Sequence, residues 1–292
     1  MIVIDLSHTL YSTILGTKYE DIAPDQLSMD IFRHICLSTI RNILNKFKFK
    51  YGNEIVIACD GKYNWRKKEF EHYKALRRKQ RNESNLDWNQ IYEKFDTFKN
   101  ELKDNFKQYK VLEFDDAEAD DIIYGCAKVC VKHEKPLCIV SGDKDLVQLQ
   151  RYKNIIQYDS VRKQLKTVDS PVDFLYLQIF KGDNADGIPN VLSPLNSYVI
   201  GKRCTPLRET KIQKWLEDPL FDSNPRLVLG DEIFERYKLN KMLIDLSEIP
   251  RNILDKIIES IETPFEERDN NLLMNYFINK RLSNLIKNIQ DF

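Results

Sequence analysis

The sequence predicts an α/β fold, in which a mostly parallel central sheet carries helices on both faces and a helical region follows. Short, continuous apolar runs alternate with segments whose apolar residues recur every three to four positions, as expected for buried strands joined by helices. Residues after position 186 keep the helical pattern without a comparable apolar run. A chain of 292 residues, 42% of them hydrophobic and 31% charged, is long enough to bury such a core.

The predicted elements follow one another in the order that a parallel sheet requires. Each apolar run is separated from the next by enough residues for a helical crossover. Ser28 is the expected cap of the first helical pattern. Strands are predicted within residues 1–6, 54–60, 109–114 and 136–145, and helices within 28–47, 88–106, 115–133 and 174–180.

Carboxylates follow every predicted strand. In open parallel sheets the carboxyl ends of the strands border the ligand crevice, so these side chains are expected to gather there. A single Asp after a strand is usually a turn residue or a helix cap, but its recurrence at each strand end favours a shared site. One more pair lies in the Gly-bounded turn KGDNADG, after the last predicted helix. The nine candidates are Asp5, Asp60, Glu118, Asp120, Asp121, Asp143, Asp145, Asp183 and Asp186.

The acidic cluster DDAEADD at residues 115–121 opens the third helix. Asp115, with Glu118 three residues later, is interpreted as its cap. On a helical wheel Glu118 and Asp120 flank the apolar face, whereas Asp121 points away from it. Carboxylates at the border of a core must be protonated or neutralised by cations, so the cluster predicts metal ligands.

Oxygen ligands without His or Cys suit a hard divalent ion. The set predicts Mg²⁺, with Mn²⁺ as a substitute, rather than zinc or copper. Nine carboxylates exceed the needs of one magnesium ion, so two ions and in-line displacement at a phosphodiester are expected. The six cysteines form no CxxC pair, and we expect reduced core thiols. No apolar stretch is long enough for a membrane span.

The formal net charge is zero, but the charges are segregated. Residues 61–82 contain nine Lys or Arg against two Glu, with aromatic side chains interleaved. Although a charge run is usually a solvated helix face, this mixture suits stacking on bases beside a phosphate backbone. The segment therefore predicts contact with nucleic acid.

Five segments, in this order, resemble the acid motifs of the flap endonuclease family of 5' nucleases. They are MIVIDLSHTL, VIACDGKYNWRKKEFEHYKALRRKQR, DDAEADDIIYG, IVSGDKDLVQL and KGDNADGIPNV, and the resemblance extends to the end of the chain. It implies a PIN-like nuclease fold and a magnesium-dependent 5' to 3' exonuclease and flap endonuclease, which removes RNA primers and adjacent DNA in lagging-strand replication. By position, Asp60, Glu118, Asp120, Asp143 and Asp145 match the ligands of a first metal; Asp5, Asp183 and Asp186 match those of a second; Asp121 matches a further acid of bacteriophage members.

The resemblance assigns the basic segment to the family's helical arch, at about residues 61–106. Lys74 and Arg77 would stabilise charge at the scissile phosphate, and Asp120 and Asp143 are the acids also assigned to catalysis. Tyr73 would stack on a base. The remaining expected nucleic-acid contacts are Arg66, Lys67, Arg78, Arg81, Lys202 and Arg203. We read none of the four histidines as catalytic.

One part of the pattern departs from the family. Gly187 and Asn190 replace an Asn and a Gly, and the following segment lacks the Gly-x-Gly spacing of a duplex-binding helical hairpin. Duplex binding would then fall to Lys202, Arg203 and Arg208, or to a partner. The predicted division is an α/β nuclease core with the arch (1–186) and a C-terminal helical DNA- and partner-binding region (187–292).

The implied substrates are DNA and RNA–DNA duplexes with 5' ends or flaps. A single-strand-binding protein and a sliding clamp are implied partners of a monomer in the cytoplasm of the host cell. Three alternatives remain. A haloacid-dehalogenase-type phosphatase would need an acid where Ser7 stands. A PIN-type single-strand ribonuclease would need no basic arch, and a non-catalytic DNA-binding replication module would have no need of the nine acids.

Overall fold

The computed structural model describes residues 1–16 and 22–292, apart from the side chains of Arg78, Lys79 and Asn82. The chain forms two compact units, and both are discontinuous in sequence. Unit 1 comprises Met1–Lys62, Asn85–Thr167 and Arg251–Phe292, and unit 2 comprises Tyr63–Ser84 and Val168–Pro250. The predicted arch segment contributes to both units. The functional division at residue 186 stays a prediction.

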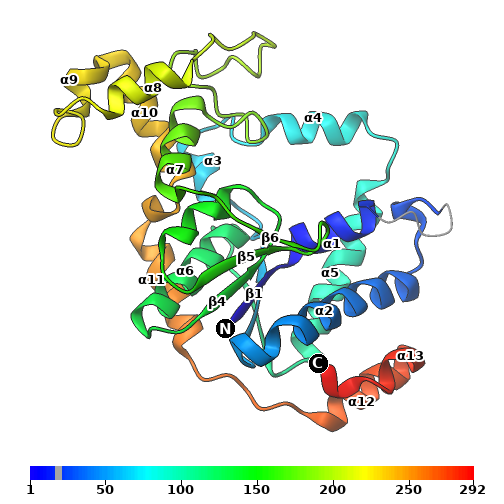
Figure 1. Ribbon diagram of the computed structural model, residues 1–292. Helices are drawn as coiled ribbons and strands as arrows, with labels where there is room; N and C mark the ends of the chain where they lie inside the picture. Colours follow the sequence, from blue (N-terminus) through cyan, green and yellow to red (C-terminus); the bar gives the residue numbers. More distant parts are fainter. Residues whose placement is uncertain (17–21) are drawn as a thin grey trace. The chain divides into compact units, whose positions relative to one another are not determined.

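Unit 1 is built on a six-stranded sheet (Figure 1). Its order is β3-β2-β1-β4-β5-β6, and every pair is parallel except β5 with β6. This arrangement confirms the predicted mostly parallel sheet. The strands are β1 (Ile2–Asp5), β2 (Ile55–Cys59), β3 (Tyr109–Glu113), β4 (Leu137–Val140), β5 (Ile155–Asp159) and β6 (Gln164–Lys166).

Strands β5 and β6 were not expected from the sequence. Strand β5 has the mixed sequence IIQYD and follows β4 without a long helix between them, only the 3₁₀ helix η2 (Asp145–Arg151). Strand β6 is three residues long and largely exposed. Neither strand is a continuous apolar run, and the antiparallel pairing of β6 needs only a turn after β5.

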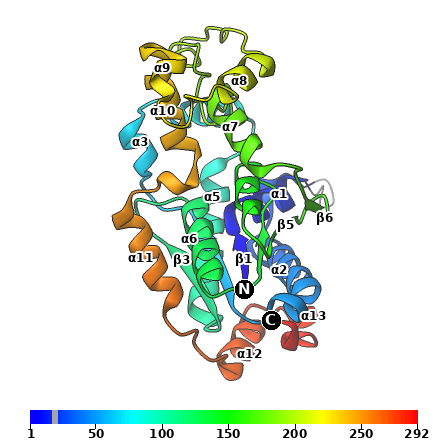
Figure 2. The same cartoon turned by 60° about the vertical axis from the view of Figure 1, so that its left-hand side comes forward.

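Helices cover both faces of the sheet in unit 1. Helix α6 packs on β1, β2 and β4, and α11 packs on α6 (Figure 2). Helix α2 contacts β1 and β4 and also packs against α1 and α5, and α12 contacts α5. The bounds are α1 (Leu6–Gly16), α2 (Met29–Tyr51), α5 (Trp88–Asn105), α6 (Ala119–Lys132), α11 (Arg251–Glu262), α12 (Asn270–Asn279) and α13 (Ser283–Ile286), with the 3₁₀ helices η1 (Pro24–Gln26) and η4 (Ile289–Asp291).

Alternate residues of the strands bury their side chains against this helical layer. Ile4 and Ile57 lie in one apolar cluster with Phe32 of α2, Phe98 of α5 and Phe277 of α12. Burial of side chains this large contributes roughly 2 kcal/mol or more each. The end of the chain thus packs into the same core as its first strand.

A buried ion pair also connects two helices of this core. The Nε atom of Arg33 on α2 lies 2.7 Å from a carboxylate oxygen of Glu101 on α5. The hydroxyl of Tyr276 on α12 donates to the same carboxylate at 2.8 Å. Removing one partner would leave a buried charge without compensation, which typically costs about 3–5 kcal/mol.

Unit 2 is helical. It comprises α3 (Trp65–Glu69), α4 (Ala75–Glu83), α7 (Pro171–Lys181), α8 (Glu209–Leu216), α9 (Pro225–Leu229), α10 (Asp231–Ile244) and the 3₁₀ helix η3 (Leu246–Glu248). Phe180 is fully buried in its core. The buried side-chain amide of Asn240 donates to the carbonyl oxygens of Ile179 and Pro189, both at 2.9 Å, and so joins α10 to the end of α7.

The helices expected within the C-terminal region are present. Among the helices of the described residues, none combines the length and apolar character that a bilayer span requires.

Candidate functional site

In unit 1 the predicted acids lie at the carboxyl ends of three neighbouring strands. Asp5 is the last residue of β1, Asp60 follows β2, and Asp143 follows β4. Burial raises the pKa of Asp5 to about 7, and the negative charges of Asp60 and Asp143 add to the shift. The structure therefore brings these three carboxylates into one electrostatic neighbourhood, as predicted from their strand-end positions.

Hydrogen bonds fix the Asp5 carboxylate between β1 and β4. Its Oδ1 accepts from the amide of His8 at 2.9 Å, and its Oδ2 accepts from the hydroxyl of Ser141 at 3.0 Å. The oxygen of Ser141 also accepts from the amide of Asp143 at 3.1 Å. One hydroxyl therefore links the acid of β1 to the acid after β4.

His8 also borders this cluster, although its sequence context indicated no role for it. Its Nδ1 accepts from the amide of Gly142 at 3.2 Å, so it touches the loop that carries Asp143. Burial lowers the pKa of His8, and the nearby carboxylates of Asp143 and Asp159 oppose that shift. Its position three residues after Asp5, in the first turn of α1, is the only sequence signal of this contact.

A glycine allows Asp60 to reach the start of α6. The amide of Gly61 donates to the carbonyl oxygen of Ala117 at 2.9 Å, and Oδ1 of Asp60 accepts from the amide of Ala119 at 3.0 Å. A Cβ atom at Gly61 would lie 1.8 Å from the carbonyl oxygen of Phe114. Only glycine permits this close approach of two backbones.

The start of α6 corrects two predictions. The N-cap residue is Glu118, not Asp115, and Asp121 completes its capping box. Oδ2 of Asp121 accepts from the amide of Glu118 at 2.9 Å, and Asp121 is fully buried rather than turned outward. The wheel failed because a side chain at the third helical position folds back to the unpaired amide of the cap. Glu118 is buried and Asp120 is half-buried, and their roles as metal ligands stay predictions, as does that of Asp121.

The two unexpected strands, β5 and β6, hold the loop with Asp143 and Asp145. The side-chain amide of Gln157 on β5 donates to the carbonyl oxygens of Ser141 at 2.9 Å and of Asp143 at 2.5 Å. Nζ of Lys166 on β6 donates to the carbonyl oxygen of Gly142 at 2.7 Å. Burial lowers the pKa of Lys166, and the charge of Asp143 opposes this. No local pattern marks either residue, since Gln and Lys are ordinary in short outer strands.

Unit 2 contains the remaining two acids. Both Asp183 and Asp186 are buried in the turn after α7. Oδ1 of Asp183 accepts from the amides of Ala185 at 2.7 Å and of Asp186 at 3.3 Å, which shapes the turn. Asp186 then faces the segment between α3 and α4, where it accepts from the hydroxyl of Tyr73 at 3.1 Å.

The same carboxylate contacts both cations that were assigned to catalysis. Nζ of Lys74 lies 3.9 Å from Oδ2 of Asp186, and the guanidinium of Arg77 forms an ion pair with Oδ1. The backbone of Lys74 is left-handed, with φ of 58°, and its amide donates to the carbonyl oxygen of Asp186 at 2.7 Å. Gly187, also at positive φ, packs so closely that a Cβ would lie 2.9 Å from the carbonyl oxygen of His72.

Two expected nucleic-acid contacts are buried in unit 2. Arg66 is 2% exposed, and its Nε donates to the carbonyl oxygen of Leu243 at 2.9 Å. Tyr73 is 4% exposed, and its hydroxyl is the donor to Asp186. Neither side chain reaches solvent, which argues against a phosphate contact by Arg66 and base stacking by Tyr73, and both assignments stay predictions. Lys67, Arg81, Lys202 and Arg203 are exposed, and the side chain of Arg78 lies outside the described part.

A turn-rich segment follows α7, in the region whose sequence lacks the Gly-x-Gly spacing of a duplex-binding helical hairpin. Residues 182–208, all of them described, form no helix. The side-chain amide of Asn190 donates to the carbonyl oxygen of Thr205 at 2.7 Å, and the amide of Thr205 donates to the hydroxyl of Ser193 at 2.9 Å. Asn190, which replaces a glycine of relatives, therefore closes a loop that displays Lys202 and Arg203.

The donor set of unit 1 fits a hard divalent cation. Among the described residues, no three His, Cys, Asp or Glu side chains converge tightly enough to enclose a metal ion. Burial nevertheless raises the pKa of Asp5, and repulsion from the negative charges of Asp60 and Asp143 adds to the shift. A bound cation would remove that repulsion, and carboxylate oxygens are the ligands that magnesium prefers.

Comparisons with known proteins identify the family of this chain. Residues 2–173 match the family model of the 5'-3' exonuclease N-terminal resolvase-like domain, and residues 169–292 match that of the T4 RNase H C-terminal part. Ribonuclease H of Enterobacteria phage T4 is 28% identical over 298 aligned residues, covering 99% of this chain and 95% of that protein.

Solved structures of a bacteriophage T5 protein share the fold. A variant of the T5 D15 flap endonuclease, in a pseudo-enzyme-product complex with DNA and metal ions, matches with a TM-score of 0.61 at 16% identity. The T5 5'-exonuclease with bound divalent zinc ions matches with a TM-score of 0.61 at 17% identity. Each match covers 89% of this chain and 97% of the T5 chain.

These matches confirm the resemblance carried by the five acid motifs. The amino-terminal family model spans more than half of the sequence and includes Asp5, Asp60, Glu118 and Asp143. The chain therefore belongs to the 5'-3' exonuclease family with an N-terminal resolvase-like domain.

Proposed function

We propose that this protein is a magnesium-dependent 5' nuclease that hydrolyses phosphodiesters of RNA primers and adjacent DNA at 5' ends and flaps during lagging-strand replication. The observation that carries the proposal is the meeting of Asp5, Asp60 and Asp143 at the carboxyl edge of the sheet. Burying the carboxyl group of Asp5 among other acids raises its pKa to about 7 and lowers the stability of the fold at neutral pH. Acids with pKa values perturbed in this way are typical of functional sites.

The acids would hold two Mg²⁺ ions, or Mn²⁺ in their place. When bound, such ions lower the pKa of a coordinated water and neutralise phosphate charge. The first set would be Asp60, Glu118, Asp120, Asp143 and Asp145. The second would be Asp5, Asp183 and Asp186, and Asp121 would support the site through the capping box.

The protein's own groups would orient the substrate and offset its charge. Lys74 and Arg77 both contact Asp186, and these two cations would stabilise charge at the scissile phosphate. Ser141 fixes the spacing between Asp5 and Asp143. Preorganised groups of this kind stabilise developing charge without rearranging during the reaction.

The substrates would be DNA and RNA–DNA duplexes, bound through the phosphate backbone by Lys67, Arg81, Lys202 and Arg203, which are exposed. Such contacts are blind to sequence and weaken with salt. A single-strand-binding protein and a sliding clamp are proposed partners, and the resemblance to the family supports them.

The test is cleavage of a 5'-labelled flap and of an RNA-primed duplex, with Mg²⁺ or with EDTA. Asp143→Asn should lose activity by several orders of magnitude, whereas Asp104→Asn, an exposed acid of α5 in the same unit, should cleave like the wild type. Equal cleavage by both variants, or by the wild type in EDTA, would refute the proposal. Faster cleavage of single-stranded RNA than of a flap would favour a PIN-type ribonuclease.

A second test concerns the two cations. Lys74→Ala should slow single-turnover cleavage about a hundredfold, the loss typical for one charge-stabilising group, while changing the Kd for the flap only slightly. If the variant loses affinity and keeps its single-turnover rate, Lys74 serves binding alone.

A further inference from the structure

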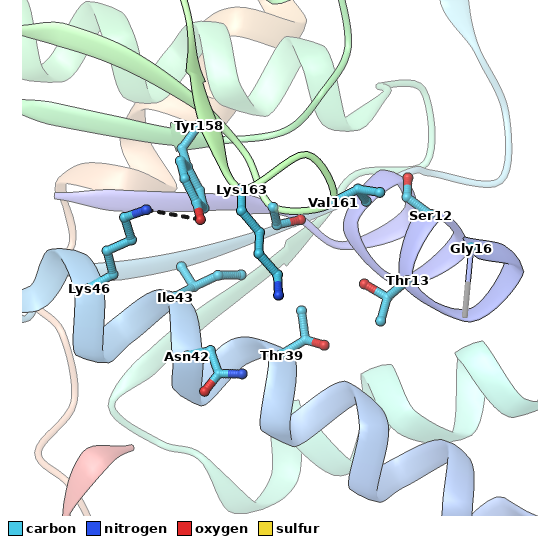
Figure 3. A pocket seen from close by; sticks show the side chains of 11 residues that line it. Ser12, Thr13, Gly16, Thr39, Asn42, Ile43, Lys46, Tyr158, Val161 and Lys163 are labelled. Atoms are coloured by element: carbon cyan, nitrogen blue, oxygen red, sulfur yellow. Dashed lines mark hydrogen bonds between the residues drawn. The ribbon is translucent and has the colours of Figure 1, made fainter. Parts of the chain in front are cut away.

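A pocket in unit 1 is lined by none of the nine candidate acids. It has a volume of about 540 Å³ and is bordered by α1, by α2 and by the turn between β5 and β6 (Figure 3). Its lining contains several hydroxyl groups and the side-chain amide of Asn42, with Ile43 at its base. This volume exceeds that of a phosphate group severalfold, so a backbone phosphate could enter together with its flanking sugars.

Two lysines give the pocket a positive charge. Lys46 on α2 and Lys163 after β5 both line the pocket. In Figure 3 the ammonium group of Lys163 points into the space between the lining residues, and that of Lys46 points to the hydroxyl of Tyr158. Nζ of Lys46 lies 3.1 Å from the hydroxyl of Tyr158 and 4.2 Å from the centre of its ring. This contact fixes one ammonium group and leaves it further donors.

The described residues that line the pocket include no Asp or Glu, although Asp159 lies between two of them, Tyr158 and Ser160, in the chain. Within the described ranges 1–16 and 22–292, neither Lys46 nor Lys163 forms an ion pair with a carboxylate, which contrasts with the surface lysines 99, 132 and 135. Two like charges beside one cavity repel each other, and a bound anion would relieve this repulsion.

One wall of the pocket is linked through His8 to the loop that carries Asp143. Ser12, on its wall, donates to the carbonyl oxygen of His8 at 2.5 Å, and Nδ1 of His8 accepts from the amide of Gly142. Tyr158, on the opposite wall, pairs with Val140 in the sheet register. Ser12 lies one helical turn after His8, and the ring of His8 contacts the loop that carries Asp143.

We propose that this pocket binds a backbone phosphate of the substrate nucleic acid, a few nucleotides from the scissile bond. The inference rests on the proposed nuclease function. Ammonium and amide donors recognise a phosphate without reading a base. The absence of acids among the described lining residues argues against a divalent cation, and the two lysines argue against an apolar ligand.

The experiment measures flap binding by fluorescence anisotropy in EDTA, at several salt concentrations. Each neutralised phosphate contributes about 0.7 to 0.9 to the slope of log K against log salt. Lys163→Gln and the double variant Lys46→Gln/Lys163→Gln should lower the slope by about one and weaken binding severalfold. The matched control is Lys153→Gln, an exposed lysine before β5, at the other end of the strand.

The wild-type cleavage assay separates this inference from the proposed function. One outcome is that the wild type cleaves flaps while the double variant binds them with the same salt slope as Lys153→Gln. That result would refute the phosphate site and leave the proposed nuclease function supported. Lys163→Gln guards against misfolding, because Lys163 is exposed and the ammonium group over the Tyr158 ring is that of Lys46. If a mononucleotide binds the wild type and not the variant, with the flap slope unchanged, the pocket serves free nucleotides and the inference is wrong.

Discussion

Lys166 donates a hydrogen bond from Nζ to the carbonyl oxygen of Gly142, at 2.7 Å. The bond crosses from the edge strand β6 to the loop after β4, over β5, whose Gln157 binds the same loop. Two outer strands therefore fix the backbone that carries Asp143. Their contribution to the site is positional, since neither side chain is a metal ligand.

Lys166→Met should lower the single-turnover cleavage rate about ten- to a hundredfold, because small displacements of catalytic groups have effects of this size. The Kd for a flap in EDTA should stay within about twofold of the wild type. Lys153→Met, an exposed lysine of the same unit, is the control. A variant with a weaker Kd and an unchanged rate would show that Lys166 contacts substrate instead.

Gly61→Ala should destabilise the protein by about 1–3 kcal/mol, a typical result of overpacking. The added Cβ would lie 1.8 Å from the carbonyl oxygen of Phe114, so the link from Asp60 to α6 must shift. Gly16→Ala is the control, because no atom of the described residues lies within 4 Å of its Cβ position. Urea unfolding of the two variants checks this, and equal midpoints would contradict the close approach.

The raised pKa of Asp5 predicts a pH effect on the metal-free protein. Its pKa is 3.8 in the unfolded reference and about 7 in the fold, so between these values the folded protein binds a proton that the unfolded chain has released. The contribution of Asp5 to stability therefore falls as pH rises from about 4 to 7, and is constant above. At 1.36 kcal/mol per pKa unit the loss approaches about 4 kcal/mol.

The substitution Asp5→Asn removes this dependence of stability on pH. The oxygen of the new side-chain amide can still accept from the backbone amide of His8, and its nitrogen can donate to the hydroxyl oxygen of Ser141. Thermal unfolding in EDTA should show that the stability of the variant, relative to that of the wild type, rises between pH 4 and 7. Mg²⁺ should stabilise the wild type more than the variant at pH 8. A difference between the two proteins that does not change with pH would show that Asp5 is not perturbed.

Loss of the charge at Arg66 should affect stability, whereas loss of the charge at Arg81 should affect the salt dependence of flap binding. Arg66→Gln should destabilise the protein by about 3 kcal/mol or more, because a buried charged side chain bonded to Leu243 is replaced by a shorter one. It should leave the salt slope of flap binding unchanged. Arg81→Gln, at an exposed site, should lower that slope and leave the urea midpoint in place. The reverse pattern would restore Arg66 as a phosphate contact.

The sequence by itself determined the parallel sheet and its carboxylate edge. Apolar runs and helical periods are local properties, and a parallel sheet places the ends of β1, β2 and β4 side by side. Asp5, Asp60 and Asp143 could therefore be grouped from their positions in the sequence alone. The family resemblance added the roles of Lys74 and Arg77, which local patterns could not supply.

Only the tertiary structure decided which side chains of the basic segment are buried and what holds the acidic loop. Arg66 and Tyr73 have the same sequence context as their exposed neighbours, and their burial depends on partners more than a hundred residues away. The inward turn of Asp121 depends on one unpaired amide. Helical periodicity reports only a residue's angle around its own axis, so it cannot say what packs against that side or which backbone group needs a partner.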